Sequence, residues 1–242
     1  MNDVSKKARE FSVTAMILAA GKGTRMRPLT DRCPKPLLPV AGTPLIERHL
    51  QKLKVAGVKH VVINCSYLAD EIFKYFDQRD DDGLAIELIS EGEEPFETAG
   101  GIANALDALG DMPFLVINGD VWCEIDYNDF VNRARSLTES NSGGELILVE
   151  NPSHNLKGDF SVCSDSGNVL NRSIQEPTFT FSGLSIFKPE LFHSLTNVSG
   201  ALGPFLRQWS DEDRLSAFLF SGYWLDVGTP ERLAELEQRI RG

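Results

Sequence analysis

The fold is decided by the stretch VTAMILAAGKGTRMRPLT, which occupies residues 13–30. Its first part, residues 13–19, is a short apolar run that is stopped by Gly21, as expected of a buried β-strand. Residues 22–39 follow with four prolines and several basic side chains, so they are expected to form a long loop. Loops of this length in compact domains usually carry function. The sequence thus places a buried strand directly before a candidate functional loop.

Beyond this loop, helical and strand-like patterns alternate up to about residue 140. Apolar residues at helical spacing favour helices, and short apolar runs between turn residues favour buried strands. The alternation is typical of βαβ units, and it predicts a doubly wound α/β fold with a mostly parallel sheet. Helices are expected over residues 44–57, 68–76, 100–109 and 127–137, and strands over residues 59–64, 84–89 and 113–118.

After the Ser-Gly-Gly of residues 142–144 the pattern becomes richer in strands. We therefore expect a disordered tail over residues 1–12 and one domain over residues 13–242, with halves of about residues 13–140 and 141–242. The second half should be the β-richer of the two. Strands are expected there over residues 145–150, 159–163, 169–174, 178–187 and 214–220, and helices over residues 189–195, 204–209 and from Thr229 onward.

The balance of acidic and basic residues limits the kinds of molecule that this protein is expected to bind. The 242 residues include 24 Lys and Arg against 35 Asp and Glu, which gives a net charge of −11 and an isoelectric point near 4.9. Such a field repels a phosphate backbone, so no nucleic-acid partner is expected. The four cysteines form no CxxC pair, and no apolar run is long enough to span a membrane. We expect a cytoplasmic protein with no membrane partner.

The glycine-rich start of the loop is suited to an anionic ligand. Small residues at Ala19, Ala20 and Gly21 let a ligand approach the backbone, and successive N–H groups in such a turn bind anions. Arg25 can hold phosphate oxygens with its fork of donors, and Lys35 can add a point charge. The pattern is neither a Walker A loop nor a Rossmann dinucleotide fingerprint, because the Gly-Lys-Ser/Thr end and the third glycine are missing. A tight turn without a ligand is the alternative.

Two aspartates are candidates for a metal site. Asp120 follows the strand expected over residues 113–118, and Asp226 lies in the string WLDVGTP of residues 224–230. If both follow strands that end at one sheet edge, their carboxylates can hold Mg²⁺, with phosphates and water completing the octahedron. The alternative is that each aspartate stabilises a chain reversal.

Five motifs in a fixed order resemble the sugar-1-phosphate nucleotidyltransferase family. The resemblance covers about residues 13–240, and it implies a nucleotide-binding first half and a sugar-binding second half. It also implies in-line attack of a sugar 1-phosphate on the α-phosphorus of a nucleoside triphosphate, with Mg²⁺ as cofactor and pyrophosphate released. The motifs are LAAGKGTRMRPLT at residues 18–30, KPL at 35–37, ETAGG at 97–101, NGD at 118–120 and WLDVGT at 224–229.

The resemblance further implies roles for individual residues. Arg25 and Lys35 would be the catalytic cations, Asp120 and Asp226 would hold Mg²⁺, and the 97–101 loop would read the base. The sugar pocket would include Gly158, Asp159 and Glu176, although many relatives have Glu-Lys-Pro where this chain has Gln-Glu-Pro at residues 175–177. The nucleotide-binding residues implied are Ala19, Ala20, Gly21, Gly23, Thr24, Arg25, Lys35, Glu97, Thr98, Gly100, Asn118 and Gly119.

Shorter strings favour one substrate pair within the family. The chain length and four strings resemble members of the family that use UTP and N-acetylmuramate α-1-phosphate, and the resemblance implies this substrate pair and a place in peptidoglycan recycling. The strings are NGDVW at residues 118–122, NP at 151–152, GDF at 158–160 and FSGL at 181–184. Glucose or mannose 1-phosphate, or phosphocholine, are the alternative substrates. A catalytically silent sensor of nucleotide sugars is an alternative of another class. The intact set of cations and aspartates argues against it, because a sensor has no need of metal ligands.

Overall fold

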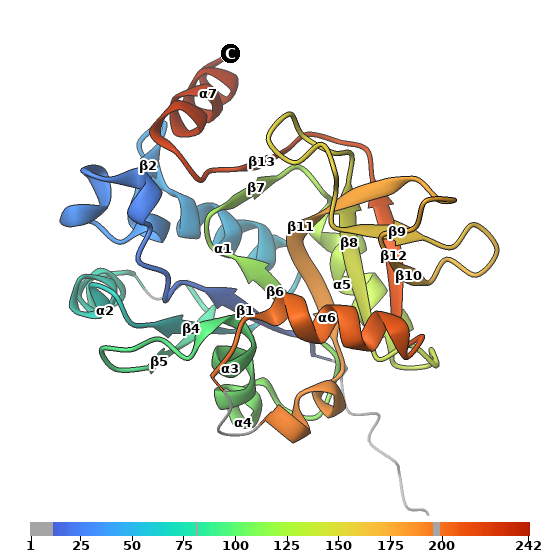
Figure 1. Ribbon diagram of the computed structural model, residues 1–242. Helices are drawn as coiled ribbons and strands as arrows, with labels where there is room; N and C mark the ends of the chain where they lie inside the picture. Colours follow the sequence, from blue (N-terminus) through green and yellow to red (C-terminus); the bar gives the residue numbers. More distant parts are fainter. Residues whose placement is uncertain (1–11, 81, 196–198) are drawn as a thin grey trace, which may run out of the picture.

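A nine-stranded sheet forms the centre of the computed structural model, which describes residues 12–80, 82–195 and 199–242 (Figure 1). Seven strands follow the order β10-β9-β11-β6-β1-β4-β5, and β8 and β12 continue the sheet from β11. The strands are β1 (Thr14–Leu18), β4 (His60–Cys65), β5 (Ala85–Ser90), β6 (Phe114–Asn118), β8 (Gly144–Val149), β9 (Phe160–Val162), β10 (Val169–Asn171), β11 (Thr178–Phe187) and β12 (Leu215–Phe220).

Strand β1 lies between two parallel neighbours. It pairs with β4 on one side and with β6 on the other, and β4 pairs in parallel with β5. In this register Leu18 lies opposite both Asn64 and Asn118, the residues near the carboxyl ends of the neighbouring strands. Three strands therefore end together at one sheet edge, which is where open α/β sheets bind ligands.

The second half adds strands of both directions to the same sheet. β11 runs antiparallel to β6, β8 and β9, and β10 runs antiparallel to β9. β12 is parallel to β8, so every strand except β10 and β11 points in the direction of β1. The predicted mostly parallel sheet and the β-richer second half are both confirmed.

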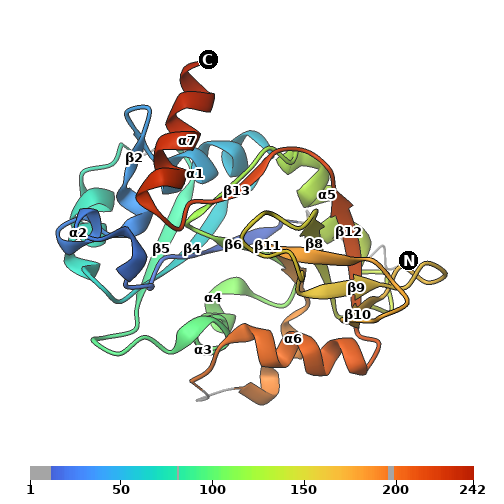
Figure 2. The ribbon, with the colours of Figure 1, turned by 45° about the horizontal axis from the view of Figure 1, so that its top comes forward.

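Helices cover both faces of the sheet, as predicted for a doubly wound fold (Figure 2). One hydrophobic cluster joins the sheet to one layer of helices, and it includes Leu50, Ile72 and Phe130. A second cluster on the opposite face includes Ile102 and Trp209. The first layer consists of α1 (Leu45–Val55), α2 (Ala69–Asp77) and α5 (Tyr127–Leu137), and the second of α3 (Glu97–Asn104), α4 (Leu106–Leu109) and α6 (Leu202–Asp211).

Three expectations about local structure are wrong. Residues 97–101 are not a loop, because α3 already begins at Glu97. The helix expected over residues 189–195 is replaced by two short 3₁₀ turns, because Phe192 packs between Phe187 and Trp209 at ring distances of 5.3 and 5.2 Å. Strand β10 stops at Asn171 instead of residue 174, because the chain leaves the sheet there and Ile174 is exposed.

Two small ladders complete the fold. β7 (Val121–Cys123) pairs antiparallel with β13 (Trp224–Asp226), and β2 (Pro39–Val40) pairs with β3 (Thr43–Pro44). The final helix, α7 (Pro230–Arg241), packs Leu236 onto a third hydrophobic cluster formed with these segments. Figure 1 shows α7 beside β2 and beyond the end of β13.

The remaining expectations concern the tail and the membrane. Most of the predicted disordered tail, residues 1–11, lies outside the described residues. In the part of the chain that the structure describes, no helix is long and apolar enough to cross a membrane. All four cysteines are described and are free thiols.

Candidate active site

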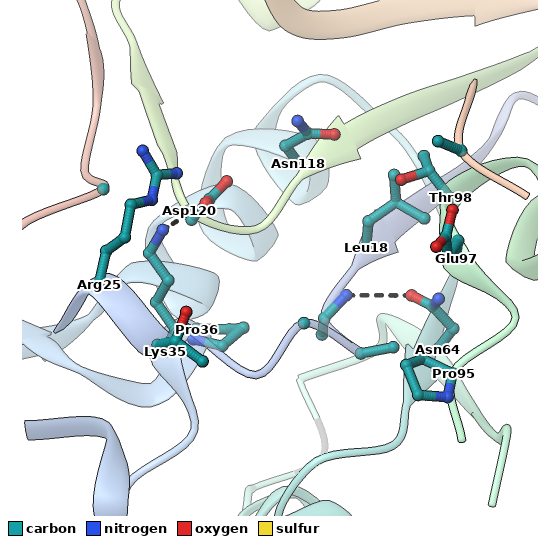
Figure 3. Close-up of a pocket in the computed structure, with 17 residues that line it drawn as sticks. Leu18, Arg25, Lys35, Pro36, Asn64, Pro95, Glu97, Thr98, Asn118 and Asp120 are labelled. Atoms are coloured by element: carbon teal, nitrogen blue, oxygen red, sulfur yellow. Dashed lines mark hydrogen bonds and ion pairs between the residues drawn. The ribbon is translucent and has the colours of Figure 1, made fainter. Parts of the chain in front are cut away.

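A cavity of about 450 Å³ opens at the carboxyl edge of the sheet, over the ends of β1 and β6. Figure 3 shows Arg25, Lys35 and Asp120 at one end of it and Leu18, Glu97 and Thr98 at the other. One end is therefore charged, and the other is framed by the end of β1 and the start of α3. The lining also includes Ala19, Ala20, Gly21, Gly23, Thr24, Pro36, Asn64, Pro95, Asn118, Ala201 and Gly228.

Gly23 fixes the shape of the loop that follows β1. Its φ of 59° lies in the left-handed region, and a Cβ there would stand 3.0 Å from Thr30 Cγ2 and 3.2 Å from Lys35 Cβ. The Thr30 hydroxyl donates to the Gly23 carbonyl at 2.8 Å, and the Met26 side chain is fully buried. The long loop is thus held in one shape, with Arg25 at the cavity wall.

The two predicted cations, Arg25 and Lys35, differ in burial and in their hydrogen-bond partners. Arg25 is exposed and, among the described residues, has neither an ion pair nor a hydrogen bond, so its donors are free for a ligand. Lys35 is buried, with 8% of its side chain exposed, and its ammonium donates to Asp120 Oδ2. The charge of Lys35 is therefore held in place before any ligand arrives.

A buried polar chain supports the opposite end of the cavity. The Ala19 N–H donates to Asn64 Oδ1 at 3.0 Å, and Asn64 Nδ2 donates to Glu91 Oε1 at 2.7 Å. The other Glu91 oxygen accepts from the Phe96 N–H at 2.9 Å, directly before α3. A Cβ on Gly101 would stand 2.5 Å from Glu91 Oε1, so this glycine makes room for the carboxylate. The chain ties the end of β1 to the start of α3.

Two predicted nucleotide-binding glycines are not brought to the cavity wall. Gly100 is buried inside α3 and is not part of the lining. Gly119 lies behind the wall, where a Cβ would stand 2.8 Å from the Leu18 carbonyl oxygen. Packing explains the position of Gly119, because its backbone lies against the end of β1 with no space for a side chain.

A second cavity of about 290 Å³ shares Arg25, Asn118 and Asp120 with the first. It brings Asp226 to the same wall, because β13 pairs with β7 and the Val227 N–H donates to the Asp120 carbonyl at 2.9 Å. The two aspartates therefore line one cavity, although they lie on segments far apart in the sequence.

The two aspartates fit a divalent cation that is bound partly by its substrate. Oδ2 of Asp120 accepts from Lys35, and Oδ2 of Asp226 accepts from Arg232 at 2.8 Å. The Oδ1 atom of each has no hydrogen bond to the described residues. The described residues hold no group of three or more potential metal ligands. Mg²⁺ is commonly bound by one or two carboxylates plus phosphates and water, so two free oxygens suffice.

A third cavity of about 430 Å³ continues from the second, with which it shares His154, Asn155 and Asp159. Gly158 also lines it, so two of the three predicted sugar-pocket residues lie there. Glu176 does not: it lines none of the three cavities and accepts a hydrogen bond from the Ser164 hydroxyl at 2.9 Å.

Comparison with known proteins identifies the family of this chain. The family model described as "Nucleotidyl transferase" matches residues 14–241. The chain belongs to this family.

Individual relatives of this nucleotidyl transferase have defined activities. The N-acetylmuramate alpha-1-phosphate uridylyltransferase of Neisseria meningitidis serogroup B is 48% identical over 92% of this chain and 96% of that protein. The mannose-1-phosphate guanyltransferase beta-A of Xenopus laevis is 32% identical over 90% of this chain and 61% of its own length. Among solved structures, HddC from Yersinia pseudotuberculosis has a TM-score of 0.77 and 26% identity, covering 94% of this chain and 99% of that one.

Sequence reasoning missed several residues of this nucleotidyl transferase site. Asn64 is the last residue but one of β4 and lies opposite Leu18, as Asn118 does at the end of β6, so a polar residue close to the end of a buried strand was a usable signal. Gly183 has a φ of 80°, and a Cβ there would stand 2.7 Å from Asn118 Nδ2. The string FSGL at residues 181–184 includes this glycine but assigns it no role, because its contact with Asn118 depends on β11 lying beside β6.

Replacement of Asn64 by leucine should weaken nucleotide binding. Asn64→Leu keeps the branched shape of the side chain but leaves the Ala19 N–H and Glu91 Oε1 each without its hydrogen-bond partner, at a loss of about 1–3 kcal/mol of stability for each. We expect the KM for the nucleotide to rise by roughly tenfold because the end of β1 is no longer fixed, with a smaller change in the KM for the sugar phosphate. Steady-state kinetics and a melting curve measure both. An unchanged nucleotide KM in a destabilised variant would contradict the positioning role.

Proposed function

We propose that this nucleotidyl transferase moves a UMP group from UTP to N-acetylmuramate α-1-phosphate, giving the UDP-sugar and pyrophosphate. The observation that carries the proposal is the wall shared by the first two cavities, Arg25, Asn118 and Asp120, since it lets two phosphorylated substrates meet. The identity to the Neisseria meningitidis uridylyltransferase, 48% over nearly the whole length of both chains, supports the choice of substrates. The product would serve peptidoglycan recycling.

In the proposed reaction, a phosphate oxygen of the sugar 1-phosphate attacks the α-phosphorus of UTP. A new P–O bond forms to the sugar phosphate as the bond between the α-phosphorus and the pyrophosphate oxygen breaks. Protein side chains do no covalent work in such a displacement, so positioning and charge stabilisation dominate. Arg25, whose donors are free, would hold the phosphates of UTP, and Gly23 and Thr24 would support them from the backbone.

Lys35 and the two aspartates would organise the charge at the shared wall. Lys35 is fixed by Asp120, so its ammonium would meet the phosphate charge without a conformational search. Asp120 and Asp226 would hold Mg²⁺ through their free Oδ1 atoms. A bound Mg²⁺ supplies further neutralisation of phosphate charge.

The two ends of the row of cavities would bind the remaining groups. Ala19, Ala20 and Gly21 would contact the nucleoside through their backbone, and Glu97 and Thr98, in the first turn of α3, would contact the base. Gly158 and Asp159 would face the sugar. The four free thiols support a reducing, cytoplasmic location.

A mannose or glucose 1-phosphate nucleotidyltransferase is the second candidate. The 32% identity to the Xenopus laevis mannose-1-phosphate guanyltransferase favours it to a lesser degree. A silent sensor is disfavoured, because an exposed Arg25 with no ion pair to the described residues and two carboxylates in the lining of one cavity are features that a reaction uses.

A matrix of substrates tests the proposal. Four nucleoside triphosphates are each combined with the 1-phosphates of N-acetylmuramate, N-acetylglucosamine, glucose and mannose, and pyrophosphate release is measured. We expect UTP with N-acetylmuramate α-1-phosphate to have the highest kcat/KM. A preference for glucose 1-phosphate with dTTP, or for mannose 1-phosphate with GTP, would replace the proposed substrates and leave the reaction class intact.

Arg25 and Lys22 form a matched pair on the same loop. Arg25→Ala should lower kcat/KM by ~10²-fold or more, because a preorganised cation at developing phosphate charge contributes several kcal/mol. Lys22 lines none of the three cavities, so Lys22→Ala should have a much smaller effect. Similar, small losses in both variants would rule out Arg25 as the phosphate ligand.

The aspartates are tested by a change that keeps their size. Asp120→Asn and Asp226→Asn should each lower kcat by at least ~10²-fold at ordinary Mg²⁺ concentrations, because each removes a carboxylate from the cation. Asp31→Asn is the control, since Asp31 lies on the loop after β1, lines none of the three cavities and forms an exposed ion pair with Arg27. Turnover is measured across a Mg²⁺ titration, with the melting temperature as a check of folding. Wild-type turnover in either site variant would remove that residue from the metal site.

A further inference from the structure

The third cavity carries positive charge from three separate segments. Lys157 lies in the loop before β9, Arg172 follows β10, and Arg207 lies on α6. Among the described lining residues, Asp159 is the single carboxylate. In a chain with a net charge of −11, this cavity is therefore a local exception.

The three cations have no acidic partner among the described residues. Lys157 and Arg172 are exposed and form no ion pair there. Arg207 is half-buried beside the Phe160 ring, 5.2 Å from its centre, and donates weakly to two neutral oxygens, the Asp159 carbonyl at 3.3 Å and Asn171 Oδ1 at 3.4 Å. Its guanidinium is thus held in position while its charge stays uncompensated.

The one carboxylate in the lining is already engaged elsewhere. Asp159 Oδ2 accepts from the Phe181 N–H at 2.9 Å, and Oδ1 accepts from Asn155 Nδ2 at 3.2 Å. These bonds fasten the loop before β9 to β11. Asp159 therefore shapes the passage between the second and third cavities and forms no ion pair with Arg207 in the structure.

The order of the three cavities determines which part of a bound sugar phosphate would lie near the cations of the third cavity. The first and second cavities meet at Arg25 and Asp120, where the proposed reaction places the phosphates. The second and third meet at His154, Asn155 and Asp159. A sugar in the second cavity with its 1-phosphate toward Asp120 must direct its far side to the third.

We infer that the third cavity binds a carboxylate carried by the sugar ring, with Arg207 and Arg172 as the specificity-determining residues. The inference rests on the proposed function, and it explains how N-acetylmuramate, which bears a lactyl carboxylate, is separated from N-acetylglucosamine, which has none. Two guanidinium groups suit this task because each presents a planar fork of donors that matches a carboxylate. A neutral sugar provides no anion for these two guanidinium groups, so the enzyme would select N-acetylmuramate over a neutral sugar by charge as well as by shape.

The test compares three sugar 1-phosphates with UTP as the common partner. They are N-acetylmuramate α-1-phosphate, its lactyl methyl ester, and N-acetylglucosamine α-1-phosphate. The ester keeps nearly all of the bulk and loses the charge. Wild-type enzyme should favour the acid over the ester by roughly tenfold or more in kcat/KM. The ratio of kcat/KM for the acid to kcat/KM for the ester should fall toward one in Arg172→Gln and in Arg207→Gln, and further in the double variant. This is the logic of a double-mutant cycle, because removing the carboxylate and removing its arginine partner abolish the same interaction.

Controls separate a binding role from a structural one. Arg214→Gln removes a half-buried cation that pairs with Glu212 beyond the end of α6 and lines none of the three cavities, and it should keep the wild-type ratio. Arg207→Lys should recover part of the ratio, because it restores the charge without the fork. Arg172 is exposed, so Arg172→Gln reports on the cavity even if Arg207→Gln lowers the melting temperature.

The outcomes distinguish this inference from the proposed function. If wild-type enzyme prefers the acid and the variants keep that preference, the carboxylate is bound elsewhere and the inference is wrong while the proposed function stands. If wild-type enzyme has the same kcat/KM for the acid and for the ester, the third cavity does not recognise the charge of the carboxylate and the inference is again wrong. If wild-type enzyme turns over none of the three sugars with UTP, the proposed function falls, and this inference falls with it.

Discussion

The parallel pairing of β1 with β4 and β6 is the constraint on which the site depends. Because Leu18 lies opposite Asn64 and Asn118, three strands end at one edge, and the loops that leave them converge on a single cavity. Each strand is apolar along its buried length and changes to polar or small residues at its end. The change from apolar to polar therefore marks both the end of the strand and the start of the binding surface.

The site also depends on the row of three adjoining cavities, whose side chains carry local charges that differ from the net negative charge of the protein. Arg25 and Lys35 concentrate positive charge where phosphates would meet, and Asp120 and Asp226 bring negative charge to the same wall. Neighbouring charges of opposite sign allow phosphates and a divalent cation to be bound together without a large net field. The cations of the third cavity lie apart from this pair of carboxylates, so the two ends of the row differ in the ligands that they favour.

Most of the fold was predictable because its local patterns are strong. The first half has long amphipathic helices between short buried strands, and each predicted segment corresponds to an observed element. The errors lie where tertiary packing overrides local pattern. Phe192 is held between two aromatic rings, which replaces a regular helix by 3₁₀ turns, and α3 begins at Glu97 within a motif that looks loop-like because of its two glycines.

The sequence by itself determined the order of elements, the loop after β1 and its cations, because periodicity and the need for glycine at Gly23 are local properties. Only the tertiary structure decided which distant side chains share a cavity. Asp226 lines a cavity with Asp120 because β13 pairs with β7, and Arg207 lines a cavity with Lys157 because α6 packs against the sheet at β10. Pairings of this kind depend on the packing of whole elements, so the sequence made the two aspartates candidates but could not place them in one cavity, and the residues around Arg207 contain no indication of its position.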